Sequence, residues 1–285
     1  MTVAPEQDIA LPPLRPFLKW AGGKGRLLTR IQPHVPAAFE NYHEPFLGGG
    51  AMFFAVRERV GGTAYLHDLN DVLINVWQRV QEDPAGLYAA LEWYHERDSK
   101  DFYYEQRTAT PQTRTAQAAR FVYLNQTAWN GLWRVNKFGQ FNVPWGDRQF
   151  KGIDRDTLFR ISDALSGATI TNKDFRDSLE KPRAGDFVYL DPPYLPISDT
   201  SKFYLYTEKR FRAPDLAELA YLCHQLTERG VHWIMSNRDT PQVRDLFPGC
   251  DIVRFTTRRS VAAQNRRDVE ALDSPEALII GKPGT

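Results

Sequence analysis

Cysteine is scarce in this chain of 285 residues, and the only two, Cys223 and Cys250, are far apart. Neither belongs to a CxxC pair, so we expect neither a disulfide framework nor a cysteine-rich zinc site, and both are predicted to be core residues. The 6 histidines form no HExxH or HxxxH pair, and a catalytic metal is therefore not predicted. The sequence indicates a protein of a reducing compartment without a metal ion.

Long apolar runs are also missing. No segment approaches the roughly 18 consecutive apolar residues that a membrane helix needs. The stretch from Met1 to Leu14 contains acids and prolines instead of the apolar core of a signal peptide, so we expect a cytoplasmic protein. A hydrophobic content of 42% and a charged content of 25% exclude disorder across the chain and indicate one or two globular domains.

Net charge is nearly absent, since 36 basic residues offset 35 acidic ones. Two stretches nevertheless contain basic residues and no acid: Arg107, Arg114, Arg120, Arg134 and Lys137 in the first, and Arg254, Arg258, Arg259, Arg266 and Arg267 in the second. Each is compatible with ordinary solvated charge or with a face that contacts phosphates. Trp129, Trp133 and Trp145 interleave with the first stretch and favour nucleic acid, because aromatic rings stack on bases or wedge into an opened duplex.

Seven short runs rich in β-branched and aromatic residues are predicted strands: Asn41–Pro45, Ala64–Asp68, Ala168–Asn172, Asp186–Leu190, Val231–Ser236, Asp251–Thr257 and Glu276–Ile280. Helical periodicity is found in six segments: Gly49–Glu58, Leu69–Gln81, Pro84–Glu96, Gln112–Leu124, Arg155–Ser166 and Pro214–Glu228. Bare apolar runs such as Phe187–Leu190 suit strands covered on both faces. Strands separated by helices predict a doubly wound α/β fold with a mostly parallel sheet.

One region breaks this alternation. Between the second and third predicted strands, residues 76–149 contain helices and aromatic-rich loops but no convincing strand. An insertion at this place can carry substrate recognition on a rigid scaffold. We therefore predict a catalytic domain formed by residues 1–75 and 155–285, and a mainly helical recognition insertion formed by residues 76–154.

The strongest local motif is Asp191-Pro192-Pro193-Tyr194, which follows the strand predicted at Phe187–Leu190. The two prolines fix the backbone and have no N–H, so the segment presents carbonyl oxygens from a rigid frame. A carboxylate beside a fixed carbonyl can accept both hydrogens of an exocyclic amine, and Tyr194 offers a flat face for a base. A proline-rich structural turn is the alternative. Its position at the carboxyl end of a parallel-type strand favours a ligand site.

A second motif, Glu44-Pro45-Phe46-Leu47-Gly48-Gly49-Gly50, lies between a predicted strand and a predicted helix. Glycines here let the backbone approach a ligand closely. Gly48 and Gly50 match the first part of the dinucleotide pattern GxGxxG, but its third glycine is missing, so a nucleoside cofactor without a pyrophosphate fits better. Asp68 ends the next predicted strand, where an acid can hold ribose hydroxyls.

A third motif, Phe17-Leu18-Lys19-Trp20-Ala21-Gly22-Gly23-Lys24, superficially resembles a phosphate-binding loop. The pattern GxxxxGK[ST] fails, because its first glycine is absent and Gly25 stands where Ser or Thr is required. A nucleoside triphosphatase is therefore not predicted.

Taken in order, these segments strongly resemble Dam-type DNA adenine-N6 methyltransferases of the D12 family. The segments are FLKWAGGKGRLL, EPFLGGGAMFF, LHDLND, WNGLWRVNKFGQFNVPWG, DPPY and the arginine-rich stretch from Arg258. Together they extend from Phe17 to about Ile280. The resemblance implies a Rossmann-like methyltransferase sheet that binds S-adenosyl-L-methionine, with an inserted helical domain that recognises DNA.

The resemblance also implies roles for individual residues. Those matching cofactor positions are Trp20, Lys24, Phe46, Gly48, Gly50, Asp68 and Asp191. Those matching the catalytic motif are Asp191, Pro192, Pro193 and Tyr194. Those matching or accompanying positions that touch DNA are Lys19, Trp129, Asn130, Leu132, Arg134, Pro144 and Arg148. In this family, Tyr or Phe occupies the place of Trp129, which would be a bulkier wedge, and Arg134 is the best candidate for reading a guanine.

The predicted activity is site-specific methylation of a flipped adenine in duplex DNA, within GATC, without a metal and by a monomer associated with the nucleoid. Two alternatives stay open: a catalytically silent DNA-binding protein on the same scaffold, and an N4-cytosine methyltransferase with the same acceptor chemistry. The sequence does not distinguish a solitary enzyme from the partner of a restriction nuclease.

Overall fold

The computed structural model describes residues 12–20, 27–136, 138–195, 211–258 and 273–283. The strands are β1 (Tyr42–Glu44), β2 (Ala64–Asp68), β3 (Thr169–Asn172), β4 (Phe187–Leu190), β5 (His232–Arg238), β6 (Asp251–Arg258) and β7 (Asp273–Gly281). The α-helices are α1 (Leu28–Ile31), α2 (Ala51–Val56), α3 (Asp71–Glu82), α4 (Pro84–Arg97), α5 (Lys100–Thr108), α6 (Arg114–Thr127), α7 (Arg155–Ala164), α8 (Phe175–Ser178), α9 (Ala213–Glu228) and α10 (Pro241–Asp245). Short 3₁₀ turns are η2 (Gln32–His34), η3 (Arg57–Arg59) and η4 (Trp129–Gly131).

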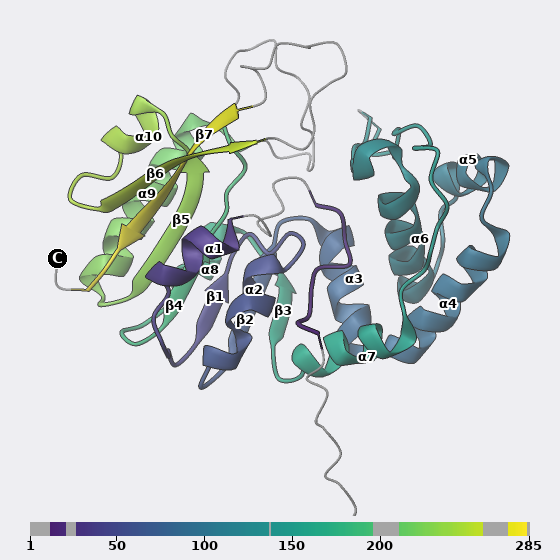
Figure 1. Ribbon diagram of the computed structural model, residues 1–285, viewed down its shortest axis with the longest axis horizontal. Helices are drawn as coiled ribbons and strands as arrows, with labels where there is room; N and C mark the ends of the chain where they lie inside the picture. The colour runs from purple at the N-terminus through teal and green to yellow at the C-terminus, as the bar shows by residue number, and fades with distance from the viewer. Residues whose placement is uncertain (1–11, 21–26, 137, 196–210, 259–272, 284–285) are drawn as a thin grey trace, which may run out of the picture.

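All seven strands form one sheet in the order β3-β2-β1-β4-β5-β7-β6 (Figure 1). The strands from β3 to β5 run parallel, and β7 runs antiparallel to both of its neighbours, β5 and β6. Each strand overlaps its predicted segment. The prediction of an α/β fold with a mostly parallel sheet is confirmed.

Alternating side chains on β4, β5 and β7 contribute to two separate cores. On β4, Phe187 and Tyr189 belong to the cluster packed under α2 and α3, whereas Val188 and Leu190 belong to the cluster under α8, α9 and α10. This is the covering on both faces that bare apolar runs predict. Cys223 of α9 is buried in the second hydrophobic cluster, which confirms its predicted core position, whereas Cys250 is only half-buried at the edge of that cluster.

The strand order places a topological switch point between β1 and β4. β2 and β3 continue the sheet on one side of β1, while β4 and β5 continue it on the other. Loops that leave the carboxyl ends of two such strands diverge to opposite faces and open a crevice, which is where doubly wound sheets bind ligands. The two strongest sequence motifs follow these two strands.

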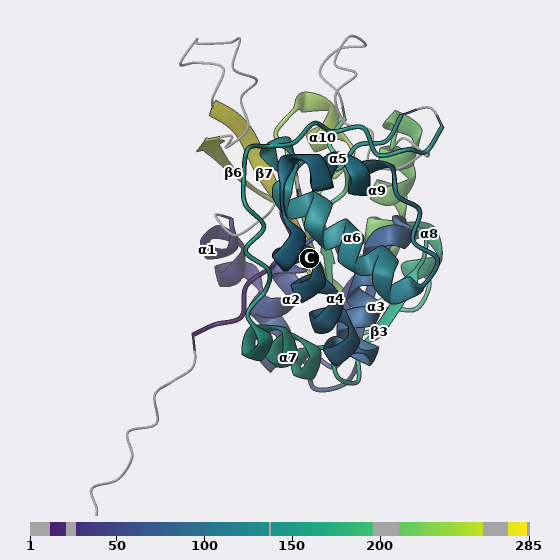
Figure 2. The same ribbon diagram turned by 90° about the vertical axis from the view of Figure 1, so that its right-hand side faces the viewer.

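Between β2 and β3 the described chain forms helices α3 to α7 and η4 but no strand. Figures 1 and 2 show α4, α5 and α6 gathered beside the sheet, next to α3. Helix α5 was not predicted, because its consecutive aromatic residues Phe102, Tyr103 and Tyr104 lack a helical period. Ser99 starts it by accepting the N–H of Phe102.

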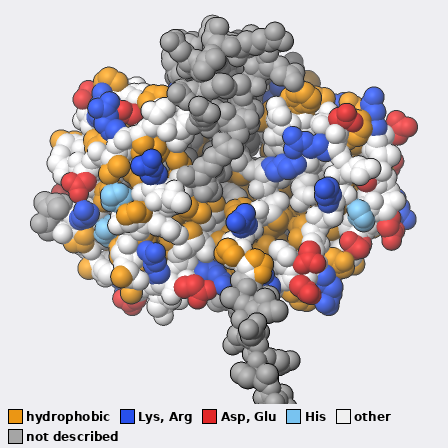
Figure 3. All heavy atoms as spheres, in the orientation of Figure 1, with side chains coloured by type: hydrophobic (Ala, Val, Ile, Leu, Met, Phe, Trp, Pro, Cys, Tyr) orange, Lys and Arg blue, Asp and Glu red, His pale blue; other side chains and the backbone are white. Residues whose placement is uncertain are grey.

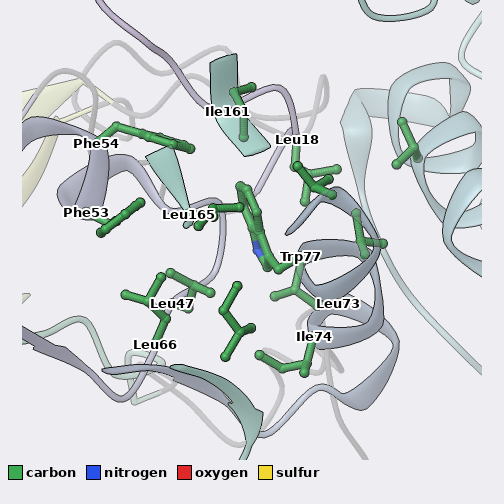
Figure 4. Packing of buried hydrophobic residues seen from close by; sticks show 14 of the residues in the cluster. Leu18, Leu47, Phe53, Phe54, Leu66, Leu73, Ile74, Trp77, Ile161 and Leu165 are labelled. Atoms are coloured by element: carbon green, nitrogen blue, oxygen red, sulfur yellow. The ribbon is translucent and has the colours of Figure 1, made fainter. Parts of the chain in front are cut away.

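Trp77 of α3 joins the helices to the glycine-rich loop. Its indole is 1% exposed and lies among Leu18, Leu73 and Ile74 and the labelled residues of α2 and α7 (Figure 4). Its Nε1 donates a hydrogen bond to the Gly48 carbonyl at 3.0 Å. The core therefore fixes the loop that follows β1. None of the described helices is both long and apolar enough to cross a membrane.

Candidate active site

The glycine-rich loop after β1 is shaped by two glycines with left-handed backbone. Gly48 has φ +49° and Gly50 has φ +71°, a region that side chains disfavour. A Cβ atom at Gly48 would lie 2.7 Å from Cδ1 of Trp20, so glycine is also required by the close approach of that indole. Trp20, Gly48 and Gly50, all predicted cofactor residues, are thus brought together. Lys24 lies outside the described residues.

Asp68 ends β2 and connects that strand to the loop. One carboxylate oxygen accepts the N–H of Gly48 at 2.9 Å, and the other accepts the N–H of Asn70 at 2.9 Å. Burial raises the pKa of Asp68 to about 6, although these hydrogen bonds oppose the shift. The carboxyl group therefore holds the glycine-rich loop against β2, at the strand end where a ribose acceptor was predicted.

Asp191 follows β4 across the switch point. Its Oδ1 accepts a hydrogen bond from the Ser236 hydroxyl at 3.0 Å, and the Tyr189 hydroxyl lies 3.0 Å from the same Ser236 oxygen. Pro192 is buried and Pro193 is exposed. Neighbouring strands β4 and β5 thus orient the carboxylate from behind.

Glu44 is the first residue of the glycine-rich motif, but the sequence did not predict it as a site residue. Its side chain is 2% exposed at the end of β1, and its Oε2 accepts the Tyr42 hydroxyl at 2.8 Å. Burial raises the pKa of Glu44 well above its ordinary value, and the carboxyl groups of Asp191 and Asp68 raise it further. A buried carboxyl group near two others is stabilised in the neutral form, although the hydrogen bond from Tyr42 opposes this shift. Its position directly before Pro45 at a strand end was the available signal.

Glu44→Gln should unfold less readily than the wild-type protein, and this difference in the free energy of unfolding should grow as pH rises. The folded chain keeps the Glu44 proton above the pH at which the unfolded chain loses it, so the stability from this group is full at acidic pH and declines toward the raised pKa. Glutamine keeps an acceptor for Tyr42 and does not ionise. Urea unfolding at several pH values should show an advantage of the variant that grows with pH. Glu58→Gln, at an exposed ion pair with Arg57, is the matched control, and equal pH profiles for Glu44→Gln and wild type would contradict the prediction.

Phe46 and Tyr194 are the two aromatic members of the motifs. Phe46 packs against Phe175 at a ring distance of 5.6 Å and against Phe211 at 6.2 Å, on the side of α8 and α9. Tyr194 is partly buried, and its hydroxyl donates to Oε2 of Glu276 at 2.5 Å. Phe46 therefore points toward the second core, and Tyr194 reaches toward β7.

The predicted DNA-contacting residues form a second cluster next to this crevice. Lys19 exchanges main-chain hydrogen bonds with the Asn125 side chain, and its Nζ donates to the Gln126 carbonyl at 2.7 Å. A Cβ at Gly131, whose φ is +64°, would lie 2.7 Å from Cβ of Lys19. Burial lowers the pKa of Lys19, and the nearby positive charge of Arg148 lowers it further. Lys19, η4 and Arg148 are therefore close neighbours.

Trp129 and Asn130 are exposed within this cluster. Trp129 has 42% of its surface exposed, and its main-chain N–H donates to the Pro144 carbonyl at 2.9 Å. Asn130 has φ +54°, an uncommon backbone state for a residue other than glycine. Leu132 is half-buried and Pro144 is exposed. The structure thus presents an aromatic ring and polar groups on one short turn.

Arg134 lies at the start of a small hairpin in which Val135 and Phe141 form a β-bridge. Its Nε donates to Oδ1 of Asn142 at 2.8 Å. The guanidinium is half-exposed and is held by one neighbour from across the hairpin. Such support fixes the direction of a side chain that is predicted to read a base.

Two members of the acid-free stretch have structural roles instead. Trp133 is 7% exposed and packs on Phe121 at a ring distance of 4.0 Å, so its interpretation as a base-stacking ring is wrong. The extended backbone alternates side chains and turns Trp133 inward, opposite to Arg134. Arg120 donates to the carbonyls of Gln106 and Arg107 at the end of α5, which makes it a helix cap and not a phosphate contact.

The second basic stretch is only partly described. Arg254 on β6 donates to Asp239, which also pairs with Arg244, so this single carboxylate offsets only part of the positive charge. Arg259, Arg266 and Arg267 lie outside the described residues. Within the described ranges, no group of three or more His, Cys, Asp or Glu side chains is placed to hold a metal ion.

Comparison with known proteins gives a consistent result. Residues 20–261 match the family described as D12 class N6 adenine-specific DNA methyltransferase. A Type II methyltransferase of Lactococcus lactis subsp. cremoris is 35% identical over 261 residues, covering 88% of this chain and 91% of that protein. The DNA adenine methylase of Serratia marcescens is 35% identical over 256 residues, covering 87% and 92%. The DNA adenine methylase of Escherichia coli (strain K12) is 32% identical over 277 residues, covering 95% and 96%.

Proposed function

The chain belongs to the D12 class N6 adenine-specific DNA methyltransferase family, and from this premise we propose that it transfers a methyl group from S-adenosylmethionine to the N6 amine of a flipped adenine, within GATC sites of duplex DNA. The observation that carries the proposal is the meeting of Gly48, Asp68 and Asp191 at the carboxyl ends of β1, β2 and β4.

The residues at this edge fit a sulfonium nucleoside. The left-handed Gly48 lets the Trp20 indole lie directly against the loop, and Asp68 offers acceptor oxygens beside it. When bound, S-adenosylmethionine would supply an electrophilic methyl group. Trp20, Gly48, Gly50 and Asp68 would bind and orient it, and the carboxylate of Asp68 would favour its positive charge.

Asp191 and its neighbours would act on the adenine. The N6 amine is a poor nucleophile, because its lone pair is delocalised into the ring. The Asp191 carboxylate and the Pro192 carbonyl would accept its two N–H bonds and favour a more pyramidal nitrogen, while Tyr194 would stack on the base. In-line attack then depends mainly on positioning. Since the amine is stacked inside a duplex, the base must first be extruded.

The group of predicted DNA-contacting residues around Lys19, Trp129 and Arg148 supports a DNA-reading role for residues 76–154. Lys19 and Arg148 bring two positive charges next to the exposed Trp129. On the face in Figure 3, several Lys and Arg side chains lie toward the middle of the molecule, whereas Asp and Glu side chains lie mostly nearer the rim. We propose that residues 76–154 are the target-recognition insertion. In this proposal Trp129 fills the space left by the extruded base, and Asn130, Leu132 and Pro144 lie at base edges.

The proposal as a whole is tested by expression in a host that lacks DNA methylation. Sequencing that detects modified bases should find N6-methyladenine in GATC. Modified cytosine instead of adenine, or DNA binding without any modification, would contradict it. N6-methyladenine confined to another sequence would retain the activity and reject the GATC assignment.

Arg134→Ala should relax discrimination at one guanine by about 1–3 kcal/mol, the value of a bidentate contact to a base edge. The guanidinium is supported by Asn142, so the loss is expected to affect one position of the site. Relative kcat/KM on duplexes that each carry one substituted base pair measures this effect. Arg148→Ala is the control: loss of a phosphate contact weakens all sequences alike and lowers the salt dependence. An unchanged site profile for Arg134→Ala would reject its role in reading the base.

A further inference from the structure

Behind the Asp-Pro-Pro-Tyr segment lies a buried carboxylate that the mechanism above does not use. Glu276 on β7 is 7% exposed, and its Oε2 accepts the Tyr194 hydroxyl at 2.5 Å. β7 pairs with the end of β5, and Glu276 is the direct cross-strand neighbour of Arg238. The only hydroxyl of the motif is therefore held by a residue 82 positions away in the sequence.

Arg238 contacts the same segment from β5. Its guanidinium carbon lies 5.9 Å from the centre of the Tyr194 ring, and its Nη1 reaches the Leu195 carbonyl at 3.4 Å. The preceding strand residues hold the other end, since Ser236 donates to Asp191. Side chains from β5 and β7 thus secure the segment at both of its ends.

Tyr194 is kept as a neutral donor in this arrangement. Burial raises the pKa of the Tyr194 hydroxyl well above its ordinary value, and the charges of Asp191 and Glu276 raise it further. A neutral phenol next to a carboxylate donates a strong, charge-assisted hydrogen bond. Such a bond restricts rotation of the side chain and so fixes the plane of the ring.

We propose that Glu276 is a positioning residue for methyl transfer, which holds the Tyr194 ring in the orientation needed to stack on the extruded adenine. This inference rests on the proposed function. A ring fixed before the base arrives loses less conformational freedom on binding, so the amine is presented to Asp191 in one orientation. Glu276 itself does not touch the reacting atoms.

The test is a set of four variants: Glu276→Ala removes the acceptor, Glu276→Gln retains a carbonyl acceptor, Tyr194→Phe removes only the hydroxyl, and a double variant combines Glu276→Ala with Tyr194→Phe. We expect kcat with a duplex substrate to fall about 10-fold in Glu276→Ala and in Tyr194→Phe, because a small misplacement has effects of this size or larger. The double variant should be no slower than either single one. Glu276→Gln should stay within about 3-fold of wild type, since the acceptor is kept.

Three readouts separate positioning from general damage. We expect kcat to fall while the KM for S-adenosylmethionine stays unchanged, and the thermal midpoint shows how much of a loss comes from general destabilisation. Asp251→Asn on the adjoining β6, whose carboxylate pairs with Lys282, is the matched control and should behave as wild type. If Glu276→Ala does not fold, Tyr194→Phe and Glu276→Gln still decide the matter, because a wild-type rate for Tyr194→Phe overturns the proposal.

Losses that multiply in the double variant would show that Glu276 acts independently of Tyr194 and would overturn the inference alone. The same holds for a Glu276→Ala effect confined to KM for the donor. An absence of adenine methylation by the wild-type protein would instead overturn the proposed function and this inference with it. The two failures are therefore distinguishable in one series of assays.

Discussion

Asp191→Ala is expected to lower methyl transfer to duplex DNA by about 1,000-fold or more, the loss typical of removing a group that stabilises the reacting centre. The carboxylate is the only charged acceptor in its motif, and Ser236 already orients it from the neighbouring strand. Without it, the amine of a bound adenine keeps its delocalised lone pair. Transfer of tritiated methyl groups from S-adenosylmethionine to a duplex containing GATC measures the loss.

Two comparisons make the Asp191 experiment specific. Asp191→Asn retains a carbonyl acceptor at the same place and should be less damaging than alanine. Donor affinity, measured by calorimetry, should change far less than the rate, because Gly48 and Asp68 form the other side of the crevice. Turnover within a factor of about ten of wild type in Asp191→Ala would remove the central element of the mechanism.

Asp68→Ala should weaken binding of S-adenosylmethionine by at least about 100-fold, because hydrogen bonds to a charged acceptor contribute about 1.5–3 kcal/mol each. The substitution removes the predicted ribose acceptor, and it also releases the N–H groups of Gly48 and Asn70. The glycine-rich loop would then lose its anchor on β2. Calorimetric titration with the donor in the absence of DNA isolates this effect from catalysis.

The raised pKa of Asp68 also predicts how the affinity for S-adenosylmethionine depends on pH. Since its pKa is raised to about 6, the carboxyl group becomes protonated as pH falls through that value and can no longer accept as an anion. Donor affinity of the wild type should therefore decline through this range, whereas Asp68→Asn should bind weakly with a flatter pH profile. Equal pH profiles for the two proteins would show that Asp68 does not contact the donor.

Much of this organisation could be predicted from local sequence. An apolar run such as Phe187–Leu190 predicts a strand whatever its neighbours in the sheet are, and the two prolines that follow it fix the local backbone. Residues that act through partners distant in the sequence could not be found in this way. Glu276 looks like an ordinary strand residue until the sheet places it beside Tyr194, 82 positions away in the sequence.

The same limit explains the wrong interpretation of Trp133 and the two alternatives that stayed open for Arg120. Trp133 and Arg120 lie in an acid-free stretch, and composition alone cannot separate an inward from an outward side chain. Only the alternation along the segment that follows η4 turns Trp133 toward Phe121. Only the arrival of α5 beside α6 gives Arg120 carbonyl groups to cap. Tertiary packing, which a single sequence does not display, decided both.

The placement of β7 inside the sheet has a consequence for the newly made chain. β7 follows β6 in the sequence, yet it lies between β6 and β5. While the chain emerges from the ribosome, β5 must keep one edge without a partner until the segment Asp273–Gly281 has been synthesised. Glu276 arrives with that same segment, so a nascent molecule can complete its crevice only after β7 has been inserted.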